Sequence, residues 1–268
     1  MASINWFIGH MAKSTAEIQK ELSGIDLVIQ VVDARSIESS SNDDLIKLAN
    51  NKPIVNVALK ADLADIKEKD NYIITSINNR SIINVIKNAI NKALEQKISK
   101  LKSKGLVNPH FYLMVVGLPN IGKSSLINKF AYKTKVEVQN RPGVTRKVSC
   151  IKVDKNFSIY DTPGIMVKKI NSDAVGYVLG TLGCIDEKVL PLEKVVEFNT
   201  DFYFKFYEKQ IREYFKYERE YEYHKFIEAQ GNRLMFIIKN NKIDYERLHK
   251  YMFNIFKAGK ICKVNYDK

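Results

Sequence analysis

The feature that most constrains this chain is a glycine-rich segment at residues 117–124, with the letters GLPNIGKS. An apolar run at residues 111–116 precedes it and predicts a buried strand, and the segment from Lys123 onward has helical spacing. A strand, a G-x-x-x-x-G-K-S loop and a helix in that order form the phosphate-binding loop of nucleotide-binding proteins. We therefore expect an α/β sheet that holds a nucleotide at the end of one strand.

Each position in this loop has a physical reason. Glycine lets backbone N–H groups curl around phosphate oxygens, and the amino end of a helix adds positive potential. Lys123 is expected to neutralise the β- and γ-phosphates, and Ser124 is expected to offer its hydroxyl to Mg²⁺. The loop residues expected to contact the nucleotide are Asn120, Ile121, Gly122, Lys123, Ser124 and Ser125.

Two later segments carry candidate groups for the metal and the γ-phosphate. Asp161 follows an apolar run and begins the letters DTPG, so we expect it to hold Mg²⁺ through water while Gly164 offers its N–H to the γ-phosphate. Thr145, within the letters RPGVT, is expected to ligate Mg²⁺ only when GTP is bound, as an order–disorder switch. The simpler alternative for both segments is an ordinary turn.

A guanine pocket needs a carboxylate, usually carried by N-K-x-D at the end of a strand, and the chain has two candidates. The upstream candidate lacks the leading Asn and consists of Leu59, Lys60, Ala61 and Asp62. The downstream candidate, NKID at residues 241–244, has all of its letters. The two candidates imply different topologies.

We favour the upstream candidate. Only 24 residues follow Asp244, too few for the loop, strand and helix that normally complete the pocket. Asp62 is followed by such a set, in which a predicted strand leads to Thr75 and Ser76 and then to a helix from Ser81. Residues 241–244 are then expected to form a turn before a C-terminal helix.

Strands alternating with helices predict an α/β sheet over the first part of the chain. The expected strands are residues 25–32, 54–59, 72–75, 111–116, 151–153 and 157–160. A long amphipathic helix is expected at residues 81–101, and its basic exit, residues 97–104, is a candidate linker. Beyond residue 170 the residue composition and patterning change. Residues 202–227 are rich in Tyr, Phe, Lys and Glu and are predicted to be helical. The expected domains are a GTP-binding domain at residues 1–170 and a smaller, mainly helical domain at residues 171–268.

Composition narrows the class of partner. The 268 residues carry a net charge of +13, which favours a polyanionic partner or, more simply, a lysine-rich composition that aids solubility. The three cysteines form no C-x-x-C pair, so no zinc knuckle or disulfide framework is expected. No run approaches the length of a membrane span and no signal segment begins the chain, so we expect a cytoplasmic protein.

With the motifs placed, the chain resembles the circularly permuted GTPases, in which the base-reading motifs precede the phosphate loop, and most of all the ribosome biogenesis GTPase A family. The resemblance rests on the segments WFIGHMAK from Trp6, VDAR from Val32, KAD from Lys60, GLPNIGKSSLIN from Gly117, RPGVT from Arg141 and DTPGI from Asp161. It covers the whole expected GTP-binding domain and extends more weakly to residues 244–260.

The resemblance implies a GTPase that binds the large ribosomal subunit late in its assembly and is stimulated by it. It also implies that Asn120 helps to hold K⁺ near the phosphates. Ile165 occupies the place of the catalytic Gln of many GTPases, and His10 is the implied residue that orients water, with a structural role as the alternative. Leu59 departs from the family Asn, so one brace between the base pocket and the phosphate loop is expected to be lost. Ile8 departs from a family Pro.

Three hypotheses remain open at this point. The first is a GTPase activated by the large subunit, with rRNA as its polyanion and no DNA partner. The second is a nucleotide-gated rRNA-binding module with negligible hydrolysis. The third is a membrane-associated GTPase, but no lipidation motif or basic amphipathic anchor supports it, so we expect no membrane partner. Candidate rRNA contacts by charge are Arg247, Lys257, Lys260 and Lys263. Tyr203, Phe206, Tyr214, Phe215 and Tyr217 could stack on bases, but at helical spacing they more often form a core.

Overall fold

The computed structural model describes residues 19–20, 22–49, 52–133, 149–153, 155–161, 170 and 172–268. The chain divides into two compact units, one within Phe7–Lys169 and the other comprising Ile170–Tyr266. We call them the sheet unit and the helical unit, and each is described by itself.

The sheet unit is built on six strands. They are β1 (Leu27–Asp33), β2 (Ile54–Leu59), β3 (Tyr72–Ile74), β4 (Phe111–Val116), β5 (Ser149–Lys152) and β6 (Phe157–Asp161). The order across the sheet is β3-β2-β1-β4-β6-β5, with β5 antiparallel and the others parallel. All seven residues of β1 are buried, as expected for a central strand of a parallel sheet.

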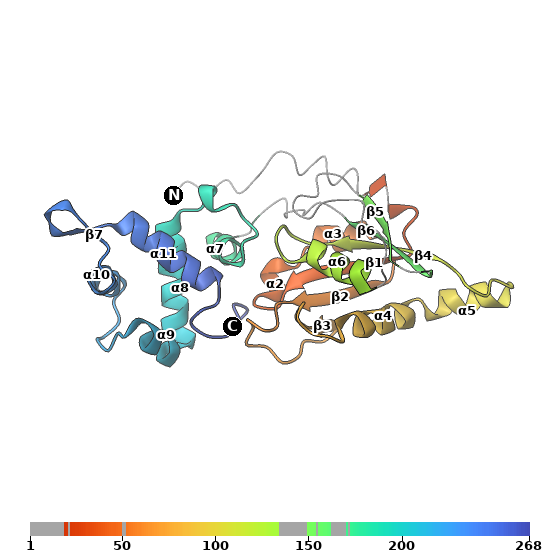
Figure 1. Cartoon of the computed structure of the whole chain (residues 1–268), viewed down its shortest axis with the longest axis horizontal. Coiled ribbons are helices and arrows are strands. Elements are labelled where there is room, and N and C mark those ends of the chain that lie inside the picture. The colour runs from red at the N-terminus through yellow and green to blue at the C-terminus, as the bar shows by residue number, and fades with distance from the viewer. Residues whose placement is uncertain are drawn as a thin grey trace. The chain divides into compact units, whose positions relative to one another are not determined.

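The strand order shows how the permuted motifs still form one site. The fourth strand along the chain, β4, lies in the middle of the sheet between β1 and β6. From β1 the chain runs outward through β2 to β3, and after β4 it crosses to the other side (Figure 1). In open α/β sheets, ligands bind beyond the carboxyl ends of the strands where the direction of winding reverses. That point lies here between β1 and β4, directly beside the phosphate loop.

Helices flank this sheet. The short helices α2 (Ile37–Ser40) and α3 (Asp43–Leu48) follow β1, α4 (Ile82–Ala93) packs on β2, and α6 (Lys123–Lys133) packs on β6. The amphipathic pattern of α4 is the reason for its packing, because Ile82, Ile83, Ile86 and Ile90 are all buried.

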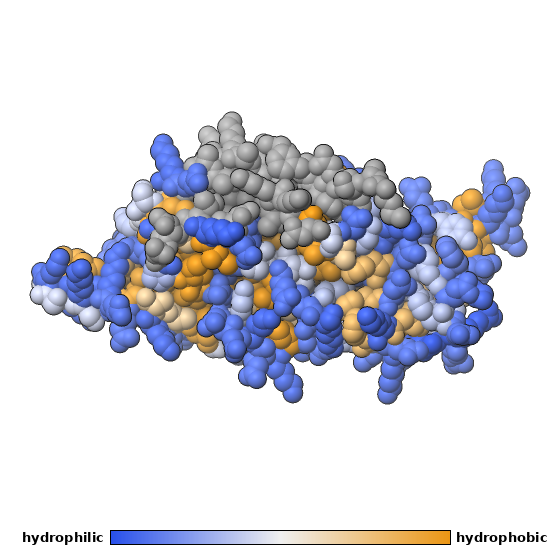
Figure 2. Space-filling view, turned by 180° about the vertical axis from the view of Figure 1, so that it is seen from behind, coloured by the Kyte–Doolittle hydropathy of each residue, from blue (hydrophilic) through white to orange (hydrophobic). Residues whose placement is uncertain are grey.

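The expected single helix at residues 81–101 is instead two helices. The first ends before Leu94, whose φ of −97° and ψ of 2° depart from helical values, and α5 (Glu95–Ser103) begins directly after it. The candidate linker at residues 97–104 is therefore helical over most of its length, because Lys, Gln and Leu have good helix propensity. No residue of α5 is buried, and the helix projects past the sheet (Figure 1). Hydrophilic side chains cover most of its projecting end (Figure 2).

The helical unit consists of five α-helices and one small hairpin among the residues that the structure describes there. The helices are α7 (Asp173–Leu182), α8 (Leu192–Phe206), α9 (Glu208–Phe215), α10 (Tyr223–Arg233) and α11 (Tyr245–Lys257). The hairpin pairs β7 (Ile237–Ile238) with β8 (Lys242–Ile243), and one-turn 3₁₀ segments lie at Glu187–Val189 and Lys239–Asn241. The prediction of helices at residues 202–227 is confirmed, and the helices are interrupted at Tyr207 and after Phe215.

Aromatic rings form the core of the helical unit. Tyr203, Phe215 and Tyr217 are buried, so the interpretation of these three as core residues is confirmed. Phe226 packs edge-on against Phe215 and Tyr217, with ring centroids 5.4 and 5.1 Å apart. Phe206 is exposed and Tyr214 is half-buried, so only these two of the five candidates keep a ring near solvent.

Two expectations about absent features concern the whole chain. No helix in the described ranges is long and apolar enough to cross a bilayer. Cys150, Cys184 and Cys262 are all unbonded thiols.

Candidate functional site

The phosphate loop leaves β4 and approaches β1 closely. A Cβ added at Gly117 would lie 2.3 Å from the carbonyl oxygen of Val31, so only glycine allows the loop to pass over β1 at this point. Gly122 has a φ of +107°, a backbone conformation that disfavours side chains. Asn120 also lies in the left-handed region, with a φ of +57°, which Asn tolerates better than most residues. These torsions curl the loop as the sequence predicts.

The loop ends at the amino terminus of α6, where Lys123 and Ser124 begin the helix. The side chain of Lys123 is buried, and its Nζ donates to the carbonyl oxygen of Leu118 at 2.9 Å. The ammonium group is thus held inside the curl of the loop. Ser124 Oγ lies 3.4 Å from Asp161 Oδ2 at the end of β6, so these two predicted metal ligands are brought together. Ser125 is exposed on the same turn of α6.

The candidate base-reading segment follows β2, on the β1 side of the phosphate loop. Lys60 has a φ of +63°, which turns the chain sharply after the buried Leu59. Ala61 then donates its N–H to the carbonyl oxygen of Thr75 at 3.1 Å, which ties this turn to the end of β3. Asp62 is exposed, as a carboxylate that contacts a ligand must be.

The segment after β3 is also fixed to the phosphate side. Thr75 is buried, and Ser76 Oγ accepts from the N–H of Asn78 at 3.2 Å. Lys129 of α6 donates its Nζ to the carbonyl oxygens of Ile77 and Asn79. The helix that begins at the phosphate loop therefore also holds the loop that carries Ser76.

Lys60 connects the two halves of the site. Its Nζ donates to the carbonyl oxygen of Asn120 in the phosphate loop at 3.3 Å and lies 2.9 Å from Asp33 Oδ2. Asp33 is the last residue of β1 and is fully buried. One side chain thus links the ends of two parallel strands to the phosphate loop.

Asp33 is held as a carboxylate by two cations. Arg35, also buried, donates its Nε to Asp33 Oδ1 at 3.0 Å and its second terminal nitrogen to Oδ2 at 2.9 Å. Burial by itself would raise the pKa of Asp33, but the hydrogen bonds and charges of Arg35 and Lys60 outweigh it and hold the pKa below its usual range. In the sequence, Asp33 and Arg35 belong to the VDAR letters that end the predicted strand at residues 25–32, and neither residue was expected to have this role. An acidic and a basic residue placed two positions apart at a strand end were the available signal.

Leu59 makes a second connection, which the departure from the family Asn did not suggest. Its side chain is buried, and a Cβ added at Gly122 would lie 3.0 Å from Leu59 Cδ1. The leucine therefore packs on the phosphate loop. The sequence predicted that a polar brace between the base pocket and the phosphate loop would be lost at this position. The structure has an apolar contact there instead.

The downstream N-K-x-D letters lie elsewhere, in the helical unit. Asn241 ends a one-turn segment within the β7–β8 hairpin, and Lys242 belongs to β8. Asp244 is the N-cap of α11, where its Oδ1 accepts from the N–H of Arg247 at 3.1 Å. The carboxylate therefore caps a helix, which agrees with the prediction of a turn before a C-terminal helix.

Three predicted site residues, His10, Thr145 and Gly164, lie outside the described residues. The same holds for Ile165. Of the predicted residues that are described, the structure brings Leu59 and Lys60 to the phosphate loop, Ala61 to Thr75, and Ser124 to Asp161.

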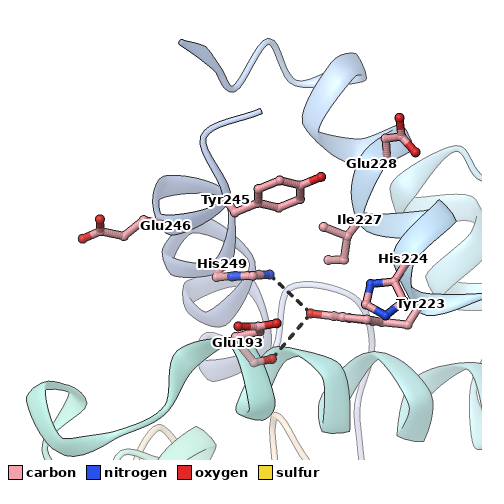
Figure 3. A pocket seen from close by; sticks show the side chains of 8 residues that line it. All are labelled: Glu193, Tyr223, His224, Ile227, Glu228, Tyr245, Glu246 and His249. Atoms are coloured by element: carbon pink, nitrogen blue, oxygen red, sulfur yellow. Dashed lines mark hydrogen bonds between the residues drawn. The ribbon is translucent and has the colours of Figure 1, made fainter. Parts of the chain in front are cut away.

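A separate pocket of about 530 Å³ lies between α8, α10 and α11 in the helical unit (Figure 3). Its floor is a small hydrogen-bond system, in which Tyr223 Oη lies 3.3 Å from His249 Nε2 and 3.5 Å from the carbonyl oxygen of Glu193. Burial lowers the pKa of His249, with the charge of Glu193 acting in the opposite direction. This pocket has no glycine-rich loop and no lysine, so it is unsuited to a triphosphate.

The sheet order and the loop geometry together define a P-loop nucleotide-binding domain whose base-side strands precede the phosphate-loop strand in the chain. The family model described as "50S ribosome-binding GTPase" matches residues 112–252. The chain belongs to this family and, within it, to the ribosome biogenesis GTPase A group of circularly permuted GTPases, which bind GTP and GDP and hydrolyse GTP.

The relatives that support this membership cover most of the chain. A protein of Mycoplasma pneumoniae named probable ribosome biogenesis GTPase A is 39% identical over 73% of this chain and 72% of its own. Ribosome biogenesis GTPase A of Bacillus cereus is 33% identical over 98% of this chain and 93% of its own. The crystal structure of GNP-bound YlqF from T. maritima matches with a TM-score of 0.65 at 20% identity, over 95% of this chain and 97% of that one, and thus shares the fold.

Proposed function

We propose that this chain is a GTP-hydrolysing assembly factor that binds the large ribosomal subunit and its rRNA late in maturation and is stimulated by that subunit. The observation that carries the proposal is the link made by Lys60 between the base side and the phosphate side of the site. Because the Lys60 side chain contacts both sides, a nucleotide that binds on one side would also affect the contacts on the other side. The printed names of the relatives direct the proposal to the ribosome.

The guanine base would be held on the β2 and β3 side. Asp62 would accept hydrogen bonds from the base, and the backbone of Leu59, Lys60 and Ala61 would form the wall of the pocket. Thr75 and Ser76 would close the pocket from the end of β3. The hydrogen bonds from Ala61 to Thr75 and from Lys129 to the following loop support this arrangement, because they fix both segments before any ligand binds.

The phosphates would be held by the backbone N–H groups of residues 120–125 and by the ammonium of Lys123, with Gly164 at the γ-phosphate. The Lys123 ammonium already lies inside the loop, on the carbonyl oxygen of Leu118. Bound phosphate would offer it a charged acceptor in exchange for a neutral one, and charge-assisted hydrogen bonds are the stronger kind.

The residues beside the phosphate loop fit Mg²⁺, a hard cation that prefers oxygen ligands. Ser124 and Asp161 present a hydroxyl and a carboxylate 3.4 Å apart, and Thr145 would complete the set. When bound, Mg²⁺ neutralises charge on the β- and γ-phosphate oxygens. Asn120, at a left-handed turn of the loop, would help to hold K⁺.

Hydrolysis would depend on positioning and charge, with water as the nucleophile. An isoleucine at position 165 has no group that orients water, and the resemblance to the family implies His10 in that role. The predicted C-terminal domain, residues 171–268, would supply rRNA contacts through Arg247, Lys257, Lys260 and Lys263. Lys260 and Lys263 are exposed, which supports their part in this assignment.

The test is GTP hydrolysis in K⁺ buffer, with purified large subunits, with small subunits, and with neither. We expect stimulation by large subunits alone, and its loss when Na⁺ replaces K⁺. Lys123→Ala should abolish the stimulated rate, whereas Lys47→Ala on the exposed side of α3 should leave it unchanged. Tight GTP-dependent binding to the large subunit without stimulation would instead favour a nucleotide-gated rRNA-binding module. Absence of both binding and stimulation would remove the ribosome from the proposal.

A further inference from the structure

The helix α5 is unusual in this chain because packing does not explain it. It directly continues the well-buried α4, yet no residue of α5 is buried. Most helical stability in proteins comes from a packed apolar face. A nine-residue helix without one must be held by the helix before it and by interactions at its ends.

Most of this helix and its C-cap form a strongly basic segment, residues 97–104, with the letters KISKLKSK, which we call the basic arm. It contains four lysines and no acidic residue. Lys97, Lys100 and Lys104 follow one another at spacings of three and four, so they lie along one face of the helix. The apolar residues of the arm, Ile98 and Leu101, are half-buried.

Among the residues that the structure describes, one of the four lysines has an ionic partner. Lys97 forms an ion pair with Asp26, which directly precedes β1, and this contact anchors the base of the arm. Within the described part of the chain, the ammonium groups of Lys100, Lys102 and Lys104 have neither an ion pair nor a hydrogen-bond acceptor. Three cations are thus presented to solvent on a projecting, mostly hydrophilic surface (Figure 2).

The arm lies near the amino ends of β1 and β4, whereas the nucleotide site lies beyond the carboxyl ends of these strands. Its anchor, Asp26, precedes β1 and accepts from the N–H of Tyr112 near the start of β4. The loop after the arm leads into Phe111, the first residue of β4. The phosphate loop follows the other end of that strand. A ligand on the arm is therefore separated from the nucleotide by the length of β4.

We propose that the basic arm binds the phosphate backbone of duplex RNA and anchors the sheet unit on rRNA independently of the nucleotide. The inference rests on the proposed ribosomal function and adds a contact surface outside the helical unit. Lysines along one helix face can follow the phosphates that border the wide, shallow minor groove of an RNA helix. Such contacts are independent of sequence and weaken with salt. An anionic membrane is the other surface that could attract the arm. Ile98 and Leu101 are half-buried, so α5 itself has no exposed apolar stripe, and the exposed Leu106 and Val107 lie in the loop after the helix.

The experiment uses the full chain and a double variant, Lys100→Gln with Lys104→Gln. The matched control is Lys47→Gln with Lys67→Gln, two exposed lysines of the same unit outside the arm. Binding to a 20-base-pair RNA duplex and to purified large subunits is measured against salt concentration. For the arm variant we expect an affinity about tenfold lower at low salt and a log–log salt slope smaller by about two, roughly one for each lysine. The control should keep the wild-type slope, and both variants should keep the intrinsic rate of GTP hydrolysis.

Unchanged slopes for the arm variant, with wild-type binding to large subunits intact, would overturn the arm and leave the proposed function standing. Failure of the wild-type chain itself to bind subunits would count against the proposed function. Sedimentation with vesicles containing anionic lipid tests the other surface. Loss of vesicle binding with unchanged RNA binding would overturn the proposal in favour of a membrane. A second variant, Lys100→Glu with Lys104→Glu, should enlarge the RNA effect, and a weaker effect than that of glutamine would also contradict it.

Discussion

Lys60 and Asp62 follow the carboxyl end of β2 in a six-stranded sheet, whereas Lys242 and Asp244 lie at the end of a two-stranded hairpin. The two pairs have the same letters at the same spacing. At the sheet, the lysine joins Asp33 to the phosphate loop and the aspartate is exposed. At the hairpin, the aspartate caps α11 and the preceding residues form a tight turn. The difference shows that a short motif acquires its chemistry from the strand before it and from the loops that meet it.

The largest expected effect is on nucleotide choice at the sheet segment. Asp62→Asn would remove a charged acceptor for two donors of guanine, and hydrogen bonds to charged groups contribute about 1.5–3 kcal/mol each. GTP affinity should fall by roughly two orders of magnitude or more, with a gain in affinity for xanthosine triphosphate. Competition between fluorescent GTP and xanthosine triphosphate measures both. Asp65→Asn, three residues along the same loop, is the control. A switch produced by Asp244→Asn instead would reverse the comparison.

The next effect concerns the apolar contact between Leu59 and the phosphate loop. Leu59→Ala should lower the free energy of unfolding by about 2–4 kcal/mol, because it leaves a cavity under Gly122. It should also weaken GTP binding, since the phosphate loop loses a supporting side chain. Val57→Ala, two residues earlier on the same face of β2, is also buried but does not support the loop. Chemical denaturation and GTP titration of both variants separate the two effects, and equal GTP affinities would contradict the proposed support.

The ion network gives a pH-dependent prediction. In Lys60→Met, Asp33 keeps only Arg35, so we expect a loss of about 1–2 kcal/mol of stability, less than for a buried charge left wholly unpaired. The lowered pKa of Asp33 contributes stability that is present above the unfolded carboxyl value of 3.8 and is lost as pH falls through the folded value. The variant should therefore unfold at a higher pH than the wild type during acid titration followed by circular dichroism. Lys69→Met, which breaks only an exposed ion pair with Glu38, should leave the midpoint unchanged.

The smallest effect is expected at the hairpin segment. Asp244→Ala removes the N-cap of α11 and should lower stability by about 1 kcal/mol without changing nucleotide preference. Asp244→Asn should be nearly neutral, because Asn is an equally good cap. Thermal unfolding of the two variants side by side measures the difference. Equal losses in both would mean that the carboxylate charge, and not the cap, stabilises this end of the helix.

Much of the fold could be predicted because it depends on local patterns. The bounds of β2 and β4 agree with the sequence prediction, since continuous apolar runs bounded by polar turns define buried parallel strands. The break at Leu94 was not predictable, because the apolar spacing continues through it. The helix expected to end at residue 101 continues to Ser103, and the candidate linker at residues 97–104 is mostly helical, because its lysines are helix formers.

The site could be predicted in part. The glycine positions of the phosphate loop follow from a motif whose geometry is local. The ion network of Asp33, Arg35 and Lys60 joins residues from two strand ends and could not be derived without the register of β1 and β2. The packing of Leu59 on Gly122 was missed for the same reason, because residues far apart in sequence meet only in the folded sheet. The roles of the site residues, His10 included, stay predictions.

The strand order also has a consequence for synthesis on the ribosome. Chains fold largely as they emerge, the amino-terminal part first. Here the adjacent strands β1, β2 and β3 and the covering helix α4 are complete by Ala93, well before the phosphate loop is made. Until β4 arrives, one side of β1, all of whose residues end up buried, remains an unpaired edge that could capture another strand. Once its first three strands have folded, the nascent chain thus exposes an unpaired strand edge until β4 emerges, and the arrival of β4 both covers that edge and supplies the phosphate loop.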